Sequence, residues 1–136
     1  MHTRRQGFTL IEVLIVVVIV GILAAIASSK FHATREGAYF STMRSDLRNL
    51  ASKQELYYAT VSGYAYGGDL EELEFAESEG VDISVTTNSG EGWAATATHR
   101  SLEAGLGCAV YFGDIDAPTD PVEPESTGTI ACRETL

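Results

Sequence analysis

The stretch "FTLIEVLIVVVIVGILAAIA", residues 8 to 27, decides the fold of this chain. It contains a single charged residue, Glu12, among side chains that are mostly aliphatic. A helix rises about 1.5 Å per residue, so about twenty residues extend about 30 Å, which matches the hydrocarbon core of a bilayer. A helix also satisfies every backbone polar group internally, as lipid requires. The stretch therefore predicts a membrane-spanning helix, which we place over residues 8–29.

The residues before the apolar stretch indicate its orientation and a processing step. Arg4 and Arg5 favour a cytoplasmic N-terminus, with the rest of the chain on the other side of the membrane. A secretory signal would end in a small-residue cleavage site after the apolar stretch, and no convincing site follows here. The small residue Gly7 precedes the stretch instead. A cut after Gly7 would remove a polar leader, residues 1–7, and leave a new amino group on Phe8.

Glu12 is the residue that an ordinary membrane helix would not carry. A carboxylate in hydrocarbon costs several kcal/mol unless it is paired or protonated. After the cut, the amine of Phe8 lies one turn from Glu12 in the same helix, and the same pair can also form between neighbouring helices. Pairing between helices would favour assembly with a fixed axial stagger. The simpler alternative is that Glu12 lies near the membrane interface and extends to water.

These residues closely resemble the N-terminal signature of type IV prepilins and of the pseudopilins of type II secretion. The resemblance is specific over about residues 4–31 and only architectural beyond the helix that follows. It implies cleavage between Gly7 and Phe8 by a membrane prepilin peptidase, followed by N-methylation of Phe8. It also implies that Glu12 engages the Phe8 amine of a neighbouring subunit.

The chain departs from the family pattern at Ser29. Many family members carry proline there, and proline breaks helical hydrogen bonding. With serine at this position, local melting of the helix between Gly21 and Ser29 stays open, and Gly21 is the remaining weak point.

The helix is predicted to continue to about residue 61. Apolar side chains after the membrane segment step by three and four residues, which is the spacing of one helical face. This stripe consists of Phe40, Met43, Leu47, Leu50, Gln54, Tyr57 and Val61, with Gln54 as its single polar member. Charged residues such as Asp46 are expected to lie mostly off this face. The stripe would form the core of a head domain, residues 30–136.

Short strands are predicted after a connecting loop, residues 62–80. Within the loop, "DLEELEF" is expected to form a short helix capped by Asp69. Four β-rich runs then follow without helices between them, at residues 81–85, 93–99, 108–113 and 127–133. Such spacing predicts an antiparallel sheet within residues 81–136, packed on the stripe of the helix. The predicted fold class is therefore α+β, with a long helix and a small C-terminal sheet, as in pilins.

The two cysteines, Cys108 and Cys132, fall on or beside the last two predicted strands. Export of the head domain favours a disulfide between them over two reduced thiols. The bridge would close a loop of about 25 residues and stabilise the fold by about 3 kcal/mol in the chain-entropy model. A disulfide-bounded C-terminal region is likewise common in pilins. The enclosed segment holds three prolines and five acids, which suit an exposed loop.

The charge pattern argues against several function classes. Residues 60–136 carry fifteen acids against two basic residues, so this part of the chain would repel nucleic acid. DNA binding through Arg44, Arg48 and Lys53 is disfavoured for that reason. The acids lack the ordered spacing of a calcium loop, and no nucleophile–base, P-loop or zinc-protease motif is present. We therefore expect a protein that is not an enzyme and has no cofactor, no metal site and no direct nucleic-acid partner.

The favoured hypothesis is a structural subunit of a type IV pilus-like filament. The protein would cross the inner membrane once, with its N-terminus in the cytoplasm, until the assembly machinery moves it into an extracellular homopolymer. A pseudopilin of a periplasmic secretion pseudopilus is the alternative in the same class. A membrane-tethered binding module is the alternative of another class. Motility, adhesion, DNA uptake and secretion all remain compatible with the residues.

Overall fold

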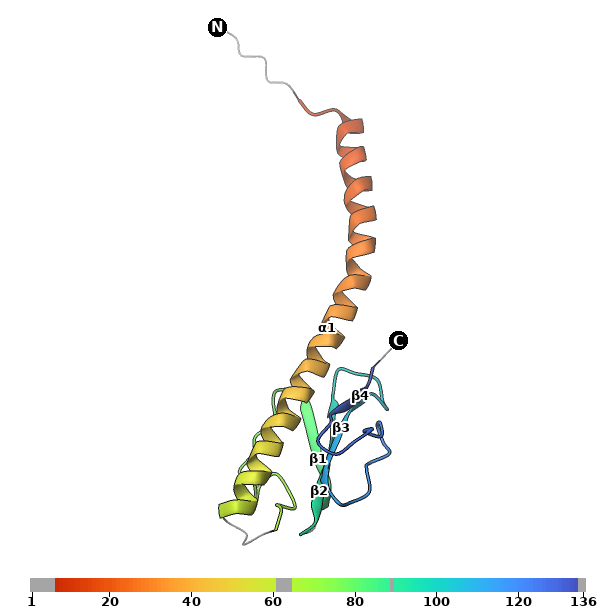
Figure 1. Ribbon diagram of the computed structural model, residues 1–136. Helices are drawn as coiled ribbons and strands as arrows, with labels where there is room; N and C mark the ends of the chain where they lie inside the picture. The colour runs from red at the N-terminus through yellow and green to blue at the C-terminus, as the bar shows by residue number, and fades with distance from the viewer. Residues whose placement is uncertain (1–6, 61–64, 89, 135–136) are drawn as a thin grey trace. The chain divides into compact units, whose positions relative to one another are not determined.

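The computed structural model describes residues 7–60, 65–88 and 90–134 of the chain. Helix α1 (Leu10–Thr60) precedes a sheet of four antiparallel strands in the order β1-β2-β3-β4 (Figure 1). The strands are β1 (Val81–Asn88), β2 (Gly92–His99), β3 (Gly107–Gly113) and β4 (Ala131–Arg133). The α+β class predicted from the sequence is confirmed. Val61 of the predicted stripe, residues 62–64 of the predicted loop and residues 1–6 of the predicted leader lie outside the described residues.

The chain divides into two compact units, Met1–Arg35 and Glu36–Leu136. We call them the N-terminal unit and the head unit. The boundary falls within α1, a few residues after the end of the predicted membrane segment at residue 29.

The described part of the N-terminal unit is a helix with no internal core. Its aliphatic side chains from residue 10 to residue 26 are all more than half exposed. The helix is long and apolar enough to cross a membrane by length and composition. Side chains that are apolar on every side of a helix need a non-aqueous surrounding, because one chain cannot cover them.

The head unit packs the second half of α1 against one face of the sheet. Phe40, Met43, Leu47 and Leu50 of the predicted stripe are at most 2% exposed. The sheet contributes alternate residues to the same core, because successive strand residues point to opposite faces. These residues are Val81 and Ile83 of β1, Trp93, Ala95 and Ala97 of β2, and Cys108 and Val110 of β3. The predicted packing of the sheet on the stripe is present.

Aromatic contacts complete the core at both ends of the sheet. The Trp93 ring stacks on Phe112 with ring centroids 5.0 Å apart, and its Nε1 has no hydrogen-bond partner among the described residues. The buried His99 stacks on Tyr39 of α1, with centroids 4.0 Å apart. Nδ1 of His99 accepts a hydrogen bond from the Ser101 N–H at 3.1 Å. The contact between His99 and Tyr39 therefore joins the end of β2 to α1.

Two polar side chains of α1 hold the connecting segment. Gln54, fully buried, donates from Nε2 to the Gly67 carbonyl at 2.9 Å and accepts from the Gly67 N–H at 2.8 Å. Asp46 accepts from the N–H and from the hydroxyl of Ser78, both at 2.8 Å. Arg44, Asp46, Arg48 and Lys53 are expected from the sequence to lie mostly off the buried face, and Asp46 is the exception, since only 4% of it is exposed. Its burial is compensated because both carboxylate oxygens accept hydrogen bonds.

The segment "DLEELEF" forms a turn and not the short helix predicted for it. Asp69 does cap the turn, since its Oδ1 accepts from the Glu72 N–H at 2.8 Å. The Phe75 N–H then donates to the Leu70 carbonyl at 2.9 Å, and Glu74 has a φ of 48°. This left-handed residue ends the turn before a second helical turn begins.

The segment between β3 and β4 covers the face of the sheet that points away from α1 (Figure 1). Pro121 and Pro124 are buried there, and Ala94 and Ala109 beneath are at most 1% exposed. A Cβ placed on Gly107 would lie 3.0 Å from Cγ of Pro121. The expectation of an exposed loop holds for its acids but is wrong for these two prolines. The small side chains of the sheet let the segment approach closely.

Candidate functional site

The candidate assembly segment lies at the N-terminal end of α1. Gly7 and Phe8 are exposed and precede the first helical residue, Leu10. The peptide bond between Gly7 and Phe8 is therefore exposed and outside the helix. Phe8 is 83% exposed. Cleavage at this bond and methylation of Phe8 stay predictions.

Glu12 lies one helical turn after Phe8 and forms a capping box with Thr9. Oε2 of Glu12 accepts from the Thr9 N–H at 3.4 Å, and the Glu12 N–H donates to Oγ1 of Thr9 at 3.3 Å. Such a reciprocal pair satisfies two backbone N–H groups at the start of a helix. The sequence pattern T-x-x-E carried this signal, and the sequence analysis missed it.

The capping box gives the carboxylate two competing roles. As a cap, Glu12 is satisfied by its own helix and stays at the first turn. As the partner of a positive amine, it would gain a charge-assisted hydrogen bond, which is roughly twice as strong as a neutral one. The two roles use the same carboxylate, and the contact with Thr9 keeps it at the N-terminal end of α1.

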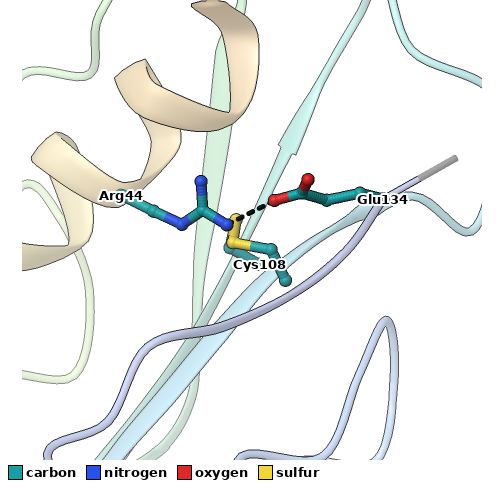
Figure 2. Close-up of polar contacts among 4 residues, drawn as sticks. Arg44, Cys108 and Glu134 are labelled. Carbon is teal, nitrogen blue, oxygen red and sulfur yellow. Dashed lines mark hydrogen bonds and ion pairs between the residues drawn. A yellow bond between two sulfur atoms is a disulfide. The ribbon is translucent and has the colours of Figure 1, made fainter. Parts of the chain in front are cut away.

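The second pair of predicted site residues, Cys108 and Cys132, forms the disulfide expected from the sequence. Their Cα atoms are partners in the register of β3 and β4. An ion pair between Arg44 of α1 and Glu134 is drawn together with this disulfide in Figure 2. The bridge and the ion pair both fix the last strand of the head unit, one to β3 and one to α1.

The connecting segment carries the shifted titrating groups. The Tyr57 hydroxyl donates to Glu72, and the Glu72 carboxylate also accepts from the Gly68 N–H at 2.7 Å. The bond from Tyr57, followed by the bond from Gly68, lowers the pKa of Glu72 below its ordinary value. The bond to Glu72 raises the pKa of Tyr57, and burial raises the pKa of Tyr66. The hydrogen bonds behind these shifts join the end of α1 to the connecting segment.

Metal ligands do not converge in the part of the chain that the structure describes. No group of three or more His, Cys, Asp or Glu side chains is placed to hold an ion there. The disulfide occupies both cysteines, so neither is available as a thiolate.

Comparison with known proteins matches the candidate assembly segment to a known motif. Residues 2–28 match the model of the prokaryotic N-terminal methylation motif. The type IV major pilin protein PilA of Myxococcus xanthus is 36% identical over 127 residues, which are 88% of this chain and 57% of that protein. The chain is thus similar to type IV pilins and type II secretion pseudopilins, and its first residues carry the N-terminal methylation motif.

Two other relatives are secretion proteins. The type II secretion system core protein G of Pseudomonas aeruginosa is 35% identical over 54% of this chain and 51% of that protein. The protein of the same name from Dickeya chrysanthemi is 34% identical over 47% of this chain and 42% of that protein. The chain thus aligns with about half the length of each curated pilin or pseudopilin relative.

Proposed function

We propose that this chain is the structural subunit of a type IV pilus-like filament. In this proposal, a prepilin peptidase cuts between Gly7 and Phe8, the new amine is methylated, and the protein waits in the inner membrane with residues 8–29 in lipid. The assembly machinery then moves it into a homopolymer, in which the apolar helices bundle and the head units form the outside.

The exposed apolar surface of the N-terminal unit carries the proposal. From Leu10 to Ile26, the large aliphatic side chains are not buried by the described part of their own chain. A bilayer covers such a surface before assembly, and the helices of other copies cover it afterwards. A bundle of identical helices covers the same apolar surface without lipid. Little apolar surface is therefore exposed to water when the helix moves from the membrane into the filament.

Glu12 supplies the register in this proposal. In hydrocarbon its carboxylate is favourable only when paired. Pairing with the Phe8 amine of the next subunit would fix the axial step between copies. The capping contact with Thr9 keeps the carboxylate at the first turn, and the stronger charge-assisted bond to the amine would displace it.

The alternative, a subunit of a secretion pseudopilus, predicts the same processing and the same bundle. The extent of the alignments favours the pilus. Similarity to the major pilin extends over 88% of this chain, and similarity to the two secretion proteins extends over about half of it. The head unit is therefore part of the likeness to the pilin. Immunogold labelling that finds long surface fibres supports the pilus, and antigen confined to the periplasm supports the pseudopilus.

The experiment that tests the proposal is mass spectrometry of the N-terminus of the native protein, combined with electron microscopy of material sheared from cells. We expect a chain that begins with methylated Phe8 and is the main component of sheared fibres. A native chain that still begins with Met1 and is absent from fibres would support a membrane-tethered binding module instead.

A further inference from the structure

The head unit contains a groove that the core does not fill. It has a volume of about 300 Å³ and lies between α1 and the sheet edge at residues 128–130. Leu47, Val110 and Phe112 line it with apolar surface, and Arg44 and Arg48 line it from α1. The groove therefore combines an apolar base with two guanidinium groups.

The two arginines differ in their partners. Arg44 is half-buried and forms an ion pair with Glu134. Arg48 is exposed, and no acid among the described residues forms an ion pair with it. The chain has a net charge of −10, yet Arg48 has no carboxylate partner among the described residues. An exposed guanidinium beside apolar surface is suited to pair with a carboxylate of another molecule.

A different surface of the head unit presents such acids. The segment between β3 and β4 covers the sheet face that points away from α1 (Figure 1). Five exposed carboxylates extend from it, and no ion pair within the described residues neutralises them. They are Asp114, Asp116, Asp120, Glu123 and Glu125; we call residues 114–125 the acidic loop. Half-buried Ile115, Pro118 and Val122 lie between these acids.

We propose that the arginine groove binds the acidic loop of a second copy of this chain. A loop carboxylate pairs with Arg48 while an apolar loop side chain contacts the base of the groove. The groove is lined by α1, β3 and residues 128–130, and the acidic loop covers the face of the sheet that points away from α1 (Figure 1), so each copy offers two different surfaces. A contact between two different surfaces is heterologous: it gives a ring where the rotation closes and a helical array where it does not, whereas a contact of a surface with itself stops at a dimer. The inference rests on the proposed filament and names the contact between its head units.

Photo-crosslinking of the full chain in its native membrane tests the contact directly. Thr129 lines the groove and is exposed, so p-benzoyl-phenylalanine at that position reports what enters it. We expect a crosslinked dimer whose joined peptides, identified by mass spectrometry, are the groove peptide of one copy and the acidic-loop peptide of another. The same probe at Glu71, which is exposed and outside both surfaces, is the control and should give at least tenfold less of this dimer.

A charge exchange gives a second readout. Arg48→Glu is expected to reduce the dimer and the yield of sheared filaments about tenfold, because like charges then face each other. Adding Asp116→Lys, Asp120→Lys or Glu123→Lys to Arg48→Glu should, for at least one of the three, restore the dimer and the filament yield to within about threefold of the unmodified chain. Lys53→Glu, on the same helix but outside the groove, is the matched control and should change neither. Trp93 fluorescence during urea unfolding confirms that each variant is folded.

The outcomes separate this inference from the proposed function. Filaments without a groove-to-loop crosslink, or a crosslink to another protein or lipid, would overturn the contact and leave the filament intact. The crosslink in cells that form no filaments would retain the contact and overturn the filament. Failure of all three exchange variants to restore the dimer would also count against the contact.

Discussion

The two units of this chain differ in the burial of their apolar residues. In the head unit, Phe40, Met43 and Leu47 are closed in by a sheet of the same chain. In the N-terminal unit, the large aliphatic side chains before residue 27 are more than half exposed. The head unit is thus stable by its own contacts, whereas the N-terminal unit depends on lipid or on other copies. In the proposed function, the head unit folds through its own contacts and the N-terminal unit serves assembly.

The largest effect confined to the head unit should come from the disulfide. Replacement of both Cys108 and Cys132 by alanine removes a link across 24 residues. We expect a loss of about 3 kcal/mol in the free energy of unfolding. Urea unfolding of the detergent-solubilised chain, followed by the fluorescence of Trp93, measures it, because the only tryptophan lies in the head core. N-terminal processing should be unchanged, and a processing defect would break the separation of the two units.

The next effect should come from the buried Gln54. Gln54→Leu keeps the size of the side chain but leaves the N–H and C=O of Gly67 without partners in the interior. We expect a loss of about 2 kcal/mol in the same urea experiment. Ser52→Ala removes only an exposed hydroxyl that donates to the Arg48 carbonyl at 3.2 Å, so it should cost less than about 0.5 kcal/mol. Equal losses in the two variants would mean that the paired amide does not hold the connecting segment.

A smaller effect should depend on pH. The pKa of Glu72 is lowered in the folded state, so the unfolded chain binds its proton more readily as the pH falls. The contribution of Glu72 to stability is therefore present above its ordinary pKa of 4.5 and is lost as the pH falls through the folded value. Glu72→Gln should flatten the fall in unfolding free energy between pH 6 and pH 3, measured by urea unfolding. Glu71→Gln, at the exposed neighbour, is the control; an equal flattening there would contradict the assignment.

The smallest effect should be confined to the N-terminal unit. Thr9→Ala removes one half of the capping box and should weaken the first turn of α1 by about 1 kcal/mol. Amide hydrogen exchange at residues 10–13 in micelles should accelerate about fivefold, while the unfolding of the head unit stays the same. Thr9→Ser keeps the hydroxyl and should exchange at the native rate. Equal rates in both variants would show that the cap is not formed.

Local patterns predicted most of the elements, and contacts distant in sequence explain the rest. The 3–4 spacing of the stripe and the alternation in residues 93–99 are local, and both elements are present. The pairs Asp46 with Ser78 and Gln54 with Gly67 join residues from different elements, and no local rule indicates them. The burial of Pro121 likewise depends on the small residues of strands that precede it.

The candidate site shows the same division. The apolar stretch with Glu12 indicated membrane and assembly because its chemistry is contained within about twenty residues. The capping contact between Thr9 and Glu12 is also local, and a T-x-x-E pattern at a helix start was sufficient to predict it. The arginine groove could not be predicted, because Arg48 and Phe112 come together only when α1 packs on β3.

The most direct test of the central claim is the assembly of a Glu12→Leu variant, with N-terminal mass spectrometry and filament yield measured on the same cells. The cleavage bond lies outside the helix, so the variant should still be cut after Gly7. Its head unit should unfold at the native urea concentration. Filaments should fall below detection, because the apolar helix then has no charged group to set its register. Normal filaments from Glu12→Leu would contradict the claim that this acid aligns one copy with the next.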